Sequence, residues 1–290
     1  MVRLSFTLND GNKFPWLAFG TGTALYNKEA KDAVIQAIKH GVTHLDGAQV
    51  YGNEESIGDA IVESGVDRST LFVTTKLWTV PAGQTVRESF EESLRKLKLD
   101  YVDLFLIHSP QNHQDLKSVW KELEAFKKEG KAKSIGVSNF RIVDLEAILP
   151  GAEFVPAVNQ IEYHPYVFKA TKPLLDFLKK HNITVASYGG LTPAFRFKDG
   201  PLDPVLKKIA KRLGESRGKP VTEGQVLQVW LRQQGVVAVS TTSKAERLQE
   251  YLDVETLPDL TTEEIEEINA EGSKVHHRVF MKWIDDDAKL

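Results

Sequence analysis

Several features are missing from this 290-residue chain, and each absence excludes a class of protein. There is no cysteine, which excludes disulfide bonds and thiolate metal sites. No apolar run approaches the roughly 20 residues that a membrane helix needs, and residues 1–6 lack the apolar stretch of a signal peptide. The formal net charge of −3 gives no basic surface for nucleic acid. We therefore expect a cytoplasmic protein with small-molecule partners, no membrane contact and no nucleic acid.

Short apolar or β-branched runs alternate with helix-length amphipathic segments along most of the chain. This alternation is typical of repeated βα units and a parallel sheet. No Gly-x-Gly-x-x-Gly turn follows the first run, so a doubly wound dinucleotide-binding sheet is not expected. Eight runs predict an α/β protein with a single (β/α)8 TIM barrel domain over residues 1–290. The predicted strands are 17–19, 43–45, 71–75, 101–107, 134–137, 154–159, 184–187 and 236–239, and the first four helices are 28–40, 53–66, 84–97 and 116–129.

Additions to this plan are expected at both ends. Residues 4–8 and 14–16 flank the turn sequence Asn-Asp-Gly-Asn, which predicts a β-hairpin that caps the bottom of the barrel. Capping boxes at Thr222 and Thr261 predict two helices that we assign as extra to the eight-fold plan. Residues 214–220 are predicted as a polar connector, and residues 273–290 as a C-terminal loop without clear periodicity.

Four residues of different chemical type follow or end the second, third and fourth predicted strands. Because catalytic groups of such barrels sit where the strands end, Asp46, Tyr51, Lys76 and His108 are expected to share one pocket. Tyrosine, with a pKa of roughly 10, is a poor acid at neutral pH unless a cation stabilises its phenolate. Lys76 would be that cation, Asp46 would hold the ammonium, and His108 would orient a carbonyl oxygen. Taken singly, the same residues would suit an ion pair and two core aromatics.

These residues lie in segments that resemble the aldo-keto reductase family over nearly the whole chain. Residues 41–48 (Gly-Val-Thr-His-Leu-Asp-Gly-Ala) and 51–58 (Tyr-Gly-Asn-Glu-Glu-Ser-Ile-Gly) resemble the family's first motif. Residues 131–140 (Lys-Ala-Lys-Ser-Ile-Gly-Val-Ser-Asn-Phe) resemble the second, and residues 239–247 occupy the place of the third. The resemblance implies reduction of an aldehyde or ketone by hydride from a nicotinamide, with Tyr51 as the general acid. It also implies a monomer.

The resemblance further implies how the barrel rim holds the cofactor. Gly20, Thr21 and Asp46 would lie near the nicotinamide ribose, and Tyr188 would stack on the ring. The carboxamide would be bound by polar residues near two strand ends, namely Ser138, Asn139 and Gln160. The pyrophosphate would lie along a loop formed by Gly189, Gly190 and Leu191. Taken alone, Ser-Asn after a strand is an ordinary helix cap.

The third motif departs from the family pattern. Its usual lysine and serine are replaced by Thr241 and Thr242, whereas Arg247 keeps the arginine that the family uses for the 2′-phosphate. Ser243 and Lys244 offer further donors near an expected helix N-terminus, which favours phosphate. The sequence therefore predicts NADPH as the cofactor, with NADH as an alternative.

The substrate wall is predicted from aromatic and polar residues near the rim. By resemblance Trp78 lines the pocket with Tyr51 and His108, and the further candidates are Trp16, Gln111, Asn112, His113, Phe280 and Trp283. For Trp16 and Trp283 we favour ordinary packing. His44 and His164 are predicted to be structural, and no metal site is expected.

Several functions remain open. Residues 188–193 and the Val-Ser-Thr-Thr-Ser stretch resemble the fungal branch of the family, which includes conjugated polyketone, ketopantoyl lactone and α-dicarbonyl reductases. An aldose- or xylose-reductase-like sugar reductase is a second possibility within the family. A cofactor-binding protein that senses redox state without turnover, and a barrel with unrelated isomerase or lyase chemistry, are the other hypotheses.

Overall fold

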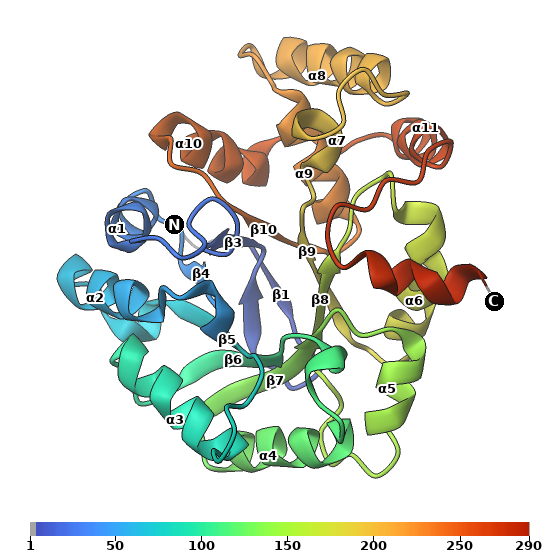
Figure 1. Cartoon of the computed structure of the whole chain (residues 1–290). Coiled ribbons are helices and arrows are strands. Elements are labelled where there is room, and N and C mark those ends of the chain that lie inside the picture. Colours follow the sequence, from blue (N-terminus) through green and yellow to red (C-terminus); the bar gives the residue numbers. More distant parts are fainter. Residues whose placement is uncertain (1–3, 290) are drawn as a thin grey trace.

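Eight parallel strands close into a barrel at the centre of the structure, ringed by helices (Figure 1). The structure, a computed structural model, describes residues 4–289. Residues 1–3, which are part of the segment 1–6 that we compared with a signal peptide, lie outside the described residues. The fold confirms the predicted TIM barrel, and the strand order around it is β10-β3-β4-β5-β6-β7-β8-β9. The strands are β3 Leu17–Gly20, β4 His44–Asp46, β5 Phe72–Leu77, β6 Val102–Ile107, β7 Ala132–Ser138, β8 Val158–Glu162, β9 Thr184–Tyr188 and β10 Val237–Ser240.

One strand lies later in the chain than its predicted position. We predicted 154–159, whereas β8 runs over Val158–Glu162. The apolar pair Phe154 and Val155 belongs to a loop, where the backbone N–H of Phe154 donates to Glu124 at 3.0 Å. The actual strand carries three buried polar residues, Asn159, Gln160 and Glu162, and these interrupt the apolar run on which the prediction depended.

The helices form the outer layer, and one of the two predicted additions was wrong. The helix that begins after Thr222 is α9, and it is buried along nearly its whole length and packs against β10, so it belongs to the ring. The extra helix is α8, which packs outside α9, contains part of the predicted connector and ends at Gly218 in the left-handed conformation (Figure 1). The helix after Thr261 is α11, and both capping boxes are formed.

The bounds of all helices are as follows. The α-helices are α1 Lys31–Lys39, α2 Glu54–Ser64, α3 Val86–Leu97, α4 Leu116–Lys128, α5 Ile142–Ile148, α6 Phe168–Lys180, α7 Thr192–Phe195, α8 Asp203–Arg217, α9 Glu223–Gln233, α10 Ala245–Asp253 and α11 Thr262–Gly272. The 3₁₀ helices are η1 Gln49–Tyr51, η2 Arg68–Thr70, η3 Pro110–Asn112, η4 Val254–Thr256 and η5 Lys282–Lys289. The last of these lies in the tail that we predicted as a loop.

The predicted N-terminal hairpin is present and fills one end of the barrel. β1 Ser5–Thr7 and β2 Lys13–Pro15 pair antiparallel, with Phe6 opposite Phe14. Phe14 is fully buried, and its ring centroid lies 5.3 Å from that of Phe72 on β5. Because the bottom is sealed by apolar side chains, ligands can enter only from the opposite rim, where the strands end. Within residues 4–289, no helix is long and apolar enough to span a membrane.

Candidate active site

The four residues predicted to act together do meet at the C-terminal rim. Asp46 ends β4, Tyr51 ends η1, Lys76 lies in β5 and His108 directly follows β6. Lys76 Nζ donates to Asp46 Oδ1 at 2.5 Å and to the carbonyl of Gly47 at 2.8 Å, and it lies 3.5 Å from Tyr51 Oη. The lysine and the aspartate are almost completely buried, at 0% and 1% exposed. The ion pair is thus held under the tyrosine and away from water.

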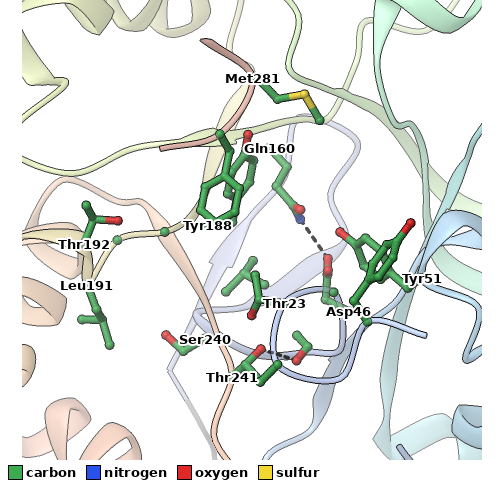
Figure 2. A pocket seen from close by; sticks show the side chains of 18 of the residues that line it. Thr23, Asp46, Tyr51, Gln160, Tyr188, Leu191, Thr192, Ser240, Thr241 and Met281 are labelled. Carbon is green, nitrogen blue, oxygen red and sulfur yellow. Dashed lines mark hydrogen bonds between the residues drawn. The ribbon is translucent and has the colours of Figure 1, made fainter. Parts of the chain in front are cut away.

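Asp46 is fixed from two sides. Its second carboxylate oxygen, Oδ2, accepts a hydrogen bond of 2.8 Å from Gln160 Nε2 on β8, drawn as a dashed line in Figure 2. Its backbone carbonyl accepts from the Thr21 N–H at 3.0 Å. Both carboxylate oxygens are therefore used, which keeps the charged group oriented toward Lys76.

Burial controls the protonation states at this site. Burial raises the pKa of Tyr51 well above its usual value, and the Asp46 carboxylate raises it further. The ammonium of Lys76, which we expected to stabilise the phenolate, lies closer to Asp46, at 2.5 Å, than to the phenol oxygen, at 3.5 Å. Burial also lowers the pKa of Lys76, against the opposing effect of Asp46. Burial, then the Lys76 charge, lowers the pKa of His108 well below its usual value. At neutral pH the site offers a protonated tyrosine and a neutral imidazole.

A cavity of about 860 Å³ opens directly above these groups. Of the predicted catalytic and substrate residues, Asp46, Tyr51, Trp78 and His108 line it, whereas Lys76 lies beneath the wall. The His108 ring makes edge contacts with both neighbours, at centroid distances of 5.4 Å to Tyr51 and 5.1 Å to Trp78. Aromatic groups thus surround the point where the tyrosine hydroxyl faces the cavity.

The residues predicted to bind a carboxamide form a connected hydrogen-bond network. Asn139 Nδ2 donates to the carbonyl of His108 at 2.9 Å, and Asn139 Oδ1 accepts from the Tyr188 hydroxyl at 2.6 Å. Ser138 Oγ donates to the carbonyl of Gln160 at 2.7 Å. Asn139, Gln160 and Tyr188 line the cavity, whereas Ser138 and Thr21 are buried behind it. The network joins the catalytic groups to the ends of β7, β8 and β9.

The loop after β9 suits a phosphate-bearing ligand. Gly189, Gly190 and Leu191 all line the cavity, and Gly189 has the left-handed conformation at φ 66°. Thr192 Oγ1, at the start of α7, is buried and has no hydrogen-bond partner within the described part of the chain. A cavity of this size, with an unpartnered hydroxyl and two lining arginines, Arg196 and Arg247, fits an extended anionic cofactor.

The structure separates the residues predicted for the 2′-phosphate. Arg247 lines the cavity with its guanidinium 4.9 Å from the Phe195 ring centroid, and Gly20 and Thr241 line it as well. The Thr241 hydroxyl donates to the carbonyl of Gly20. Thr242 is buried and accepts from the backbone N–H of Lys244. Ser243 and Lys244 are exposed and are not part of the cavity wall. Arg247 is therefore the only predicted cation that this wall contains among residues 4–289.

Several lining residues were not predicted. They are Gly22, Thr23, Ala24, Tyr26, Val50, Thr192, Phe195, Arg196, Val239, Ser240, Tyr251 and Met281. The loop after β3 could have been found from the rule that catalytic loops follow the strands. Gly22 in particular packs so closely that an added Cβ would lie 2.4 Å from the Tyr51 ring. Met281, in the tail, had no sequence signal.

The other substrate-wall candidates are divided by the structure. Phe280 lines the cavity, whereas Gln111, Asn112 and His113 do not. Trp16 is buried and donates to Glu255 at 2.9 Å, and Trp283 lies under the Arg141 guanidinium, as expected for ordinary packing. His44 is hydrogen-bonded to Thr74 at 2.9 Å, and His164 to Glu162 at 3.0 Å. No group of three or more His, Asp or Glu residues within 4–289 is arranged to hold a metal.

The fold and the rim define a class: a (β/α)8 barrel whose rim holds a tyrosine above a buried lysine–aspartate pair, at a cavity large enough for a cofactor. The model of the aldo/keto reductase family matches residues 16–271, and the chain belongs to this family. It is thus an oxidoreductase, an NAD(P)-dependent reductase of aldehydes or ketones.

Similar proteins and structures support this assignment. The chain is 40% identical over 287 residues to the NAD/NADP-dependent indole-3-acetaldehyde reductase of Schizosaccharomyces pombe, covering 95% of this chain and 98% of that one. It is 34% identical to the NADPH-dependent alpha-keto amide reductase of Saccharomyces cerevisiae, covering 96% and 93%. A solved aldo-keto reductase from a Medee basin deep-sea metagenome library superposes with a TM-score of 0.83 at 33% identity, covering 96% and 97%.

Proposed function

We propose that this protein uses NADPH to reduce activated aldehydes and ketones, with Tyr51 as the proton donor. The observation that carries the proposal is the buried Tyr51–Lys76–Asp46 group at the floor of the rim cavity, with His108 beside it. Alternative chemistries of the barrel fold, such as isomerase or lyase reactions, do not require a tyrosine held over a buried ion pair.

Tyr51 keeps its proton until charge develops on the substrate. Because burial raises its pKa, the phenol is fully protonated at neutral pH. When bound, the reduced nicotinamide supplies the hydride that adds to the carbonyl carbon. Tyr51 then gives its proton to the carbonyl oxygen, and the Lys76 ammonium at 3.5 Å stabilises the resulting phenolate. The neutral His108 ring, next to Tyr51, donates a hydrogen bond that orients the same oxygen.

NADPH is the proposed cofactor, with NADH as a weaker alternative. Arg247 supports the phosphate-bearing form because its guanidinium lines the cavity. The Thr241 hydroxyl is engaged by Gly20, so it offers less to a 2′-phosphate than a lysine would. One similar protein is named as NAD/NADP-dependent and another as NADPH-dependent, which is consistent with a preference of modest size.

The proposed substrates are aldehydes and ketones that have either a second carbonyl next to the reacting one or an apolar substituent. The cavity wall includes apolar and aromatic residues, among them Tyr26, Val50, Trp78 and Phe280. Among similar proteins, one is named for an alpha-keto amide, and another, which is 37% identical to this chain over 264 residues, is named as a glyoxal reductase of Bacillus subtilis. Both support α-dicarbonyl compounds as the substrate class, ahead of sugars.

The test is the Tyr51→Phe variant. Loss of the hydroxyl should lower kcat by about 10² to 10⁴-fold, while NADPH binding measured by quenching of tryptophan fluorescence should be unchanged. A variant that kept most of its activity would show that Tyr51 is not the proton donor. NADPH binding without turnover of any aldehyde, diketone or ketolactone by the unaltered protein would instead favour a redox-sensing role.

A further inference from the structure

The last residue of β8 binds the C-terminal segment through its carboxylate. Glu162 is 0% exposed. Its Oε1 accepts from the backbone N–H of Val279 at 2.9 Å and from His164 Nε2 at 3.0 Å, and its Oε2 accepts from the backbone N–H of Phe280 at 2.7 Å. The carboxylate satisfies all three donors because both of its oxygens accept, whereas an amide replaces one accepting oxygen by a donor group. A buried carboxylate held this way is a strong contact.

The segment that Glu162 holds forms part of the cavity wall. Phe280 and Met281 both line the cavity. The Phe280 ring makes an edge contact with Tyr188, at a centroid distance of 5.6 Å, and lies under the Arg196 guanidinium at 5.3 Å. Figure 2 shows Met281 at the edge of the pocket above Gln160. Glu162 therefore holds a segment that forms one edge of the cavity.

Met281 has an unfavourable backbone conformation that needs support. Its φ of 44° lies in the left-handed region, which is uncommon for residues other than glycine, asparagine and aspartate. Such conformations persist when the surrounding structure fixes them. The two hydrogen bonds to Glu162 fix the two residues immediately before Met281, and the Ile284 N–H donates to the Met281 carbonyl at 3.0 Å on the other side.

We propose that Glu162 is a positioning residue that sets the size selectivity of the substrate wall. Its carboxylate holds Phe280 and Met281 against the cavity, so that they contact the parts of a carbonyl compound that extend beyond the reacting group. The inference rests on the proposed function, since it concerns the same cavity. Glu162 itself touches neither the reacting carbonyl nor the proton donor, and it acts through the tail.

The isosteric variant Glu162→Gln tests this directly. The amide keeps the shape of the side chain but has one accepting oxygen, so at least one of the backbone N–H donors loses its partner. Hydrogen–deuterium exchange of the peptide containing residues 278–281 should become faster. The KM for an aromatic aldehyde should rise on the order of tenfold. Methylglyoxal is too small to reach Phe280 and Met281, so its KM and kcat should change by less than about twofold.

Glu124→Gln is the matched control. Glu124 is another buried glutamate that accepts from two consecutive backbone N–H groups, those of Glu153 at 2.6 Å and Phe154 at 3.0 Å, but it lies outside the cavity wall. Its variant should leave exchange at 278–281 and both KM values unchanged. In a Met281→Ala background, Glu162→Gln should have a smaller effect on the aromatic KM, because the side chain that it positions is gone.

The outcomes separate this inference from the proposed function. Unchanged exchange in Glu162→Gln would overturn the anchoring, and faster exchange with equal changes in both KM values would overturn the role in selectivity. If the protein reduced no carbonyl compound, the proposed function would fail, whereas the exchange measurement would still decide whether Glu162 holds the tail.

Discussion

Replacing Lys76 by Met should destabilise the protein strongly and specifically. The side chain is fully buried, and its ammonium neutralises Asp46 at 2.5 Å. Methionine fills similar space but leaves the Asp46 carboxylate buried with the Gln160 amide as its one side-chain partner among residues 4–289. Removing one partner of a buried ion pair costs about 3–5 kcal/mol, because the remaining charge is uncompensated. Urea unfolding followed by circular dichroism should show a loss of this size.

A double-mutant cycle makes this prediction sharper. Asp46→Asn alone should also be destabilising, since it leaves the ammonium with the Gly47 carbonyl and the phenol. Combining Lys76→Met with Asp46→Asn removes both charges, so the double variant should lose clearly less stability than the sum of the two single losses. Strictly additive losses, or a single-variant loss below about 1 kcal/mol, would refute the reasoning that charge compensation holds this pair together.

Three other predictions concern pH and cofactor choice. For reduction, kcat/KM should be flat from about pH 6 to 9, because the pKa of Tyr51 is raised and that of His108 is lowered; a falling limb near pH 7 would contradict this. Burial lowers the pKa of His44 from 6.5 to about 4 in the folded protein. Between pH 6.5 and pH 4 the unfolded state therefore binds more protons than the folded state does. Stability present above pH 6.5 should therefore decrease by up to about 3 kcal/mol as the pH falls toward 4, and His44→Gln should show a smaller decrease in urea unfolding. Thr241→Lys should raise the kcat/KM preference for NADPH over NADH about tenfold, and an unchanged ratio would show that position 241 does not face the 2′-phosphate.

Much of the fold could be predicted because a parallel barrel repeats one simple pattern. Strands such as β6 are buried along their whole length and contain a mainly apolar run, and capping boxes such as Thr261 with Glu264 mark helix starts. The errors have physical causes. Gly214 suggested a connector but lies within α8, where tertiary packing outweighs its low helix propensity.

The meeting of three of the candidate catalytic residues was also predictable, because it depends on the strand ends. Asp46, Lys76 and His108 each lie at the end of a strand, and barrel geometry brings those ends together whatever their separation in the sequence. The protonation of Tyr51 could not be predicted in the same way. Its pKa depends on how deeply the ring is buried and on which oxygen the Lys76 ammonium approaches, and these are properties of the packed structure.

The misplaced strand explains why the contact between Glu162 and the C-terminal wall was not predicted from the sequence. In β8 the buried polar residues Gln160 and Glu162 disrupt the apolar pattern by which a strand is found. Each of them makes a contact with a distant part of the chain, Gln160 with Asp46 and Glu162 with Phe280. Buried polar groups are stable only when such partners are present. Gln160 and Glu162 therefore weaken the local signal of the strand and also join Asp46 to the C-terminal wall, so buried polar residues within a barrel strand point to the residues that build the site.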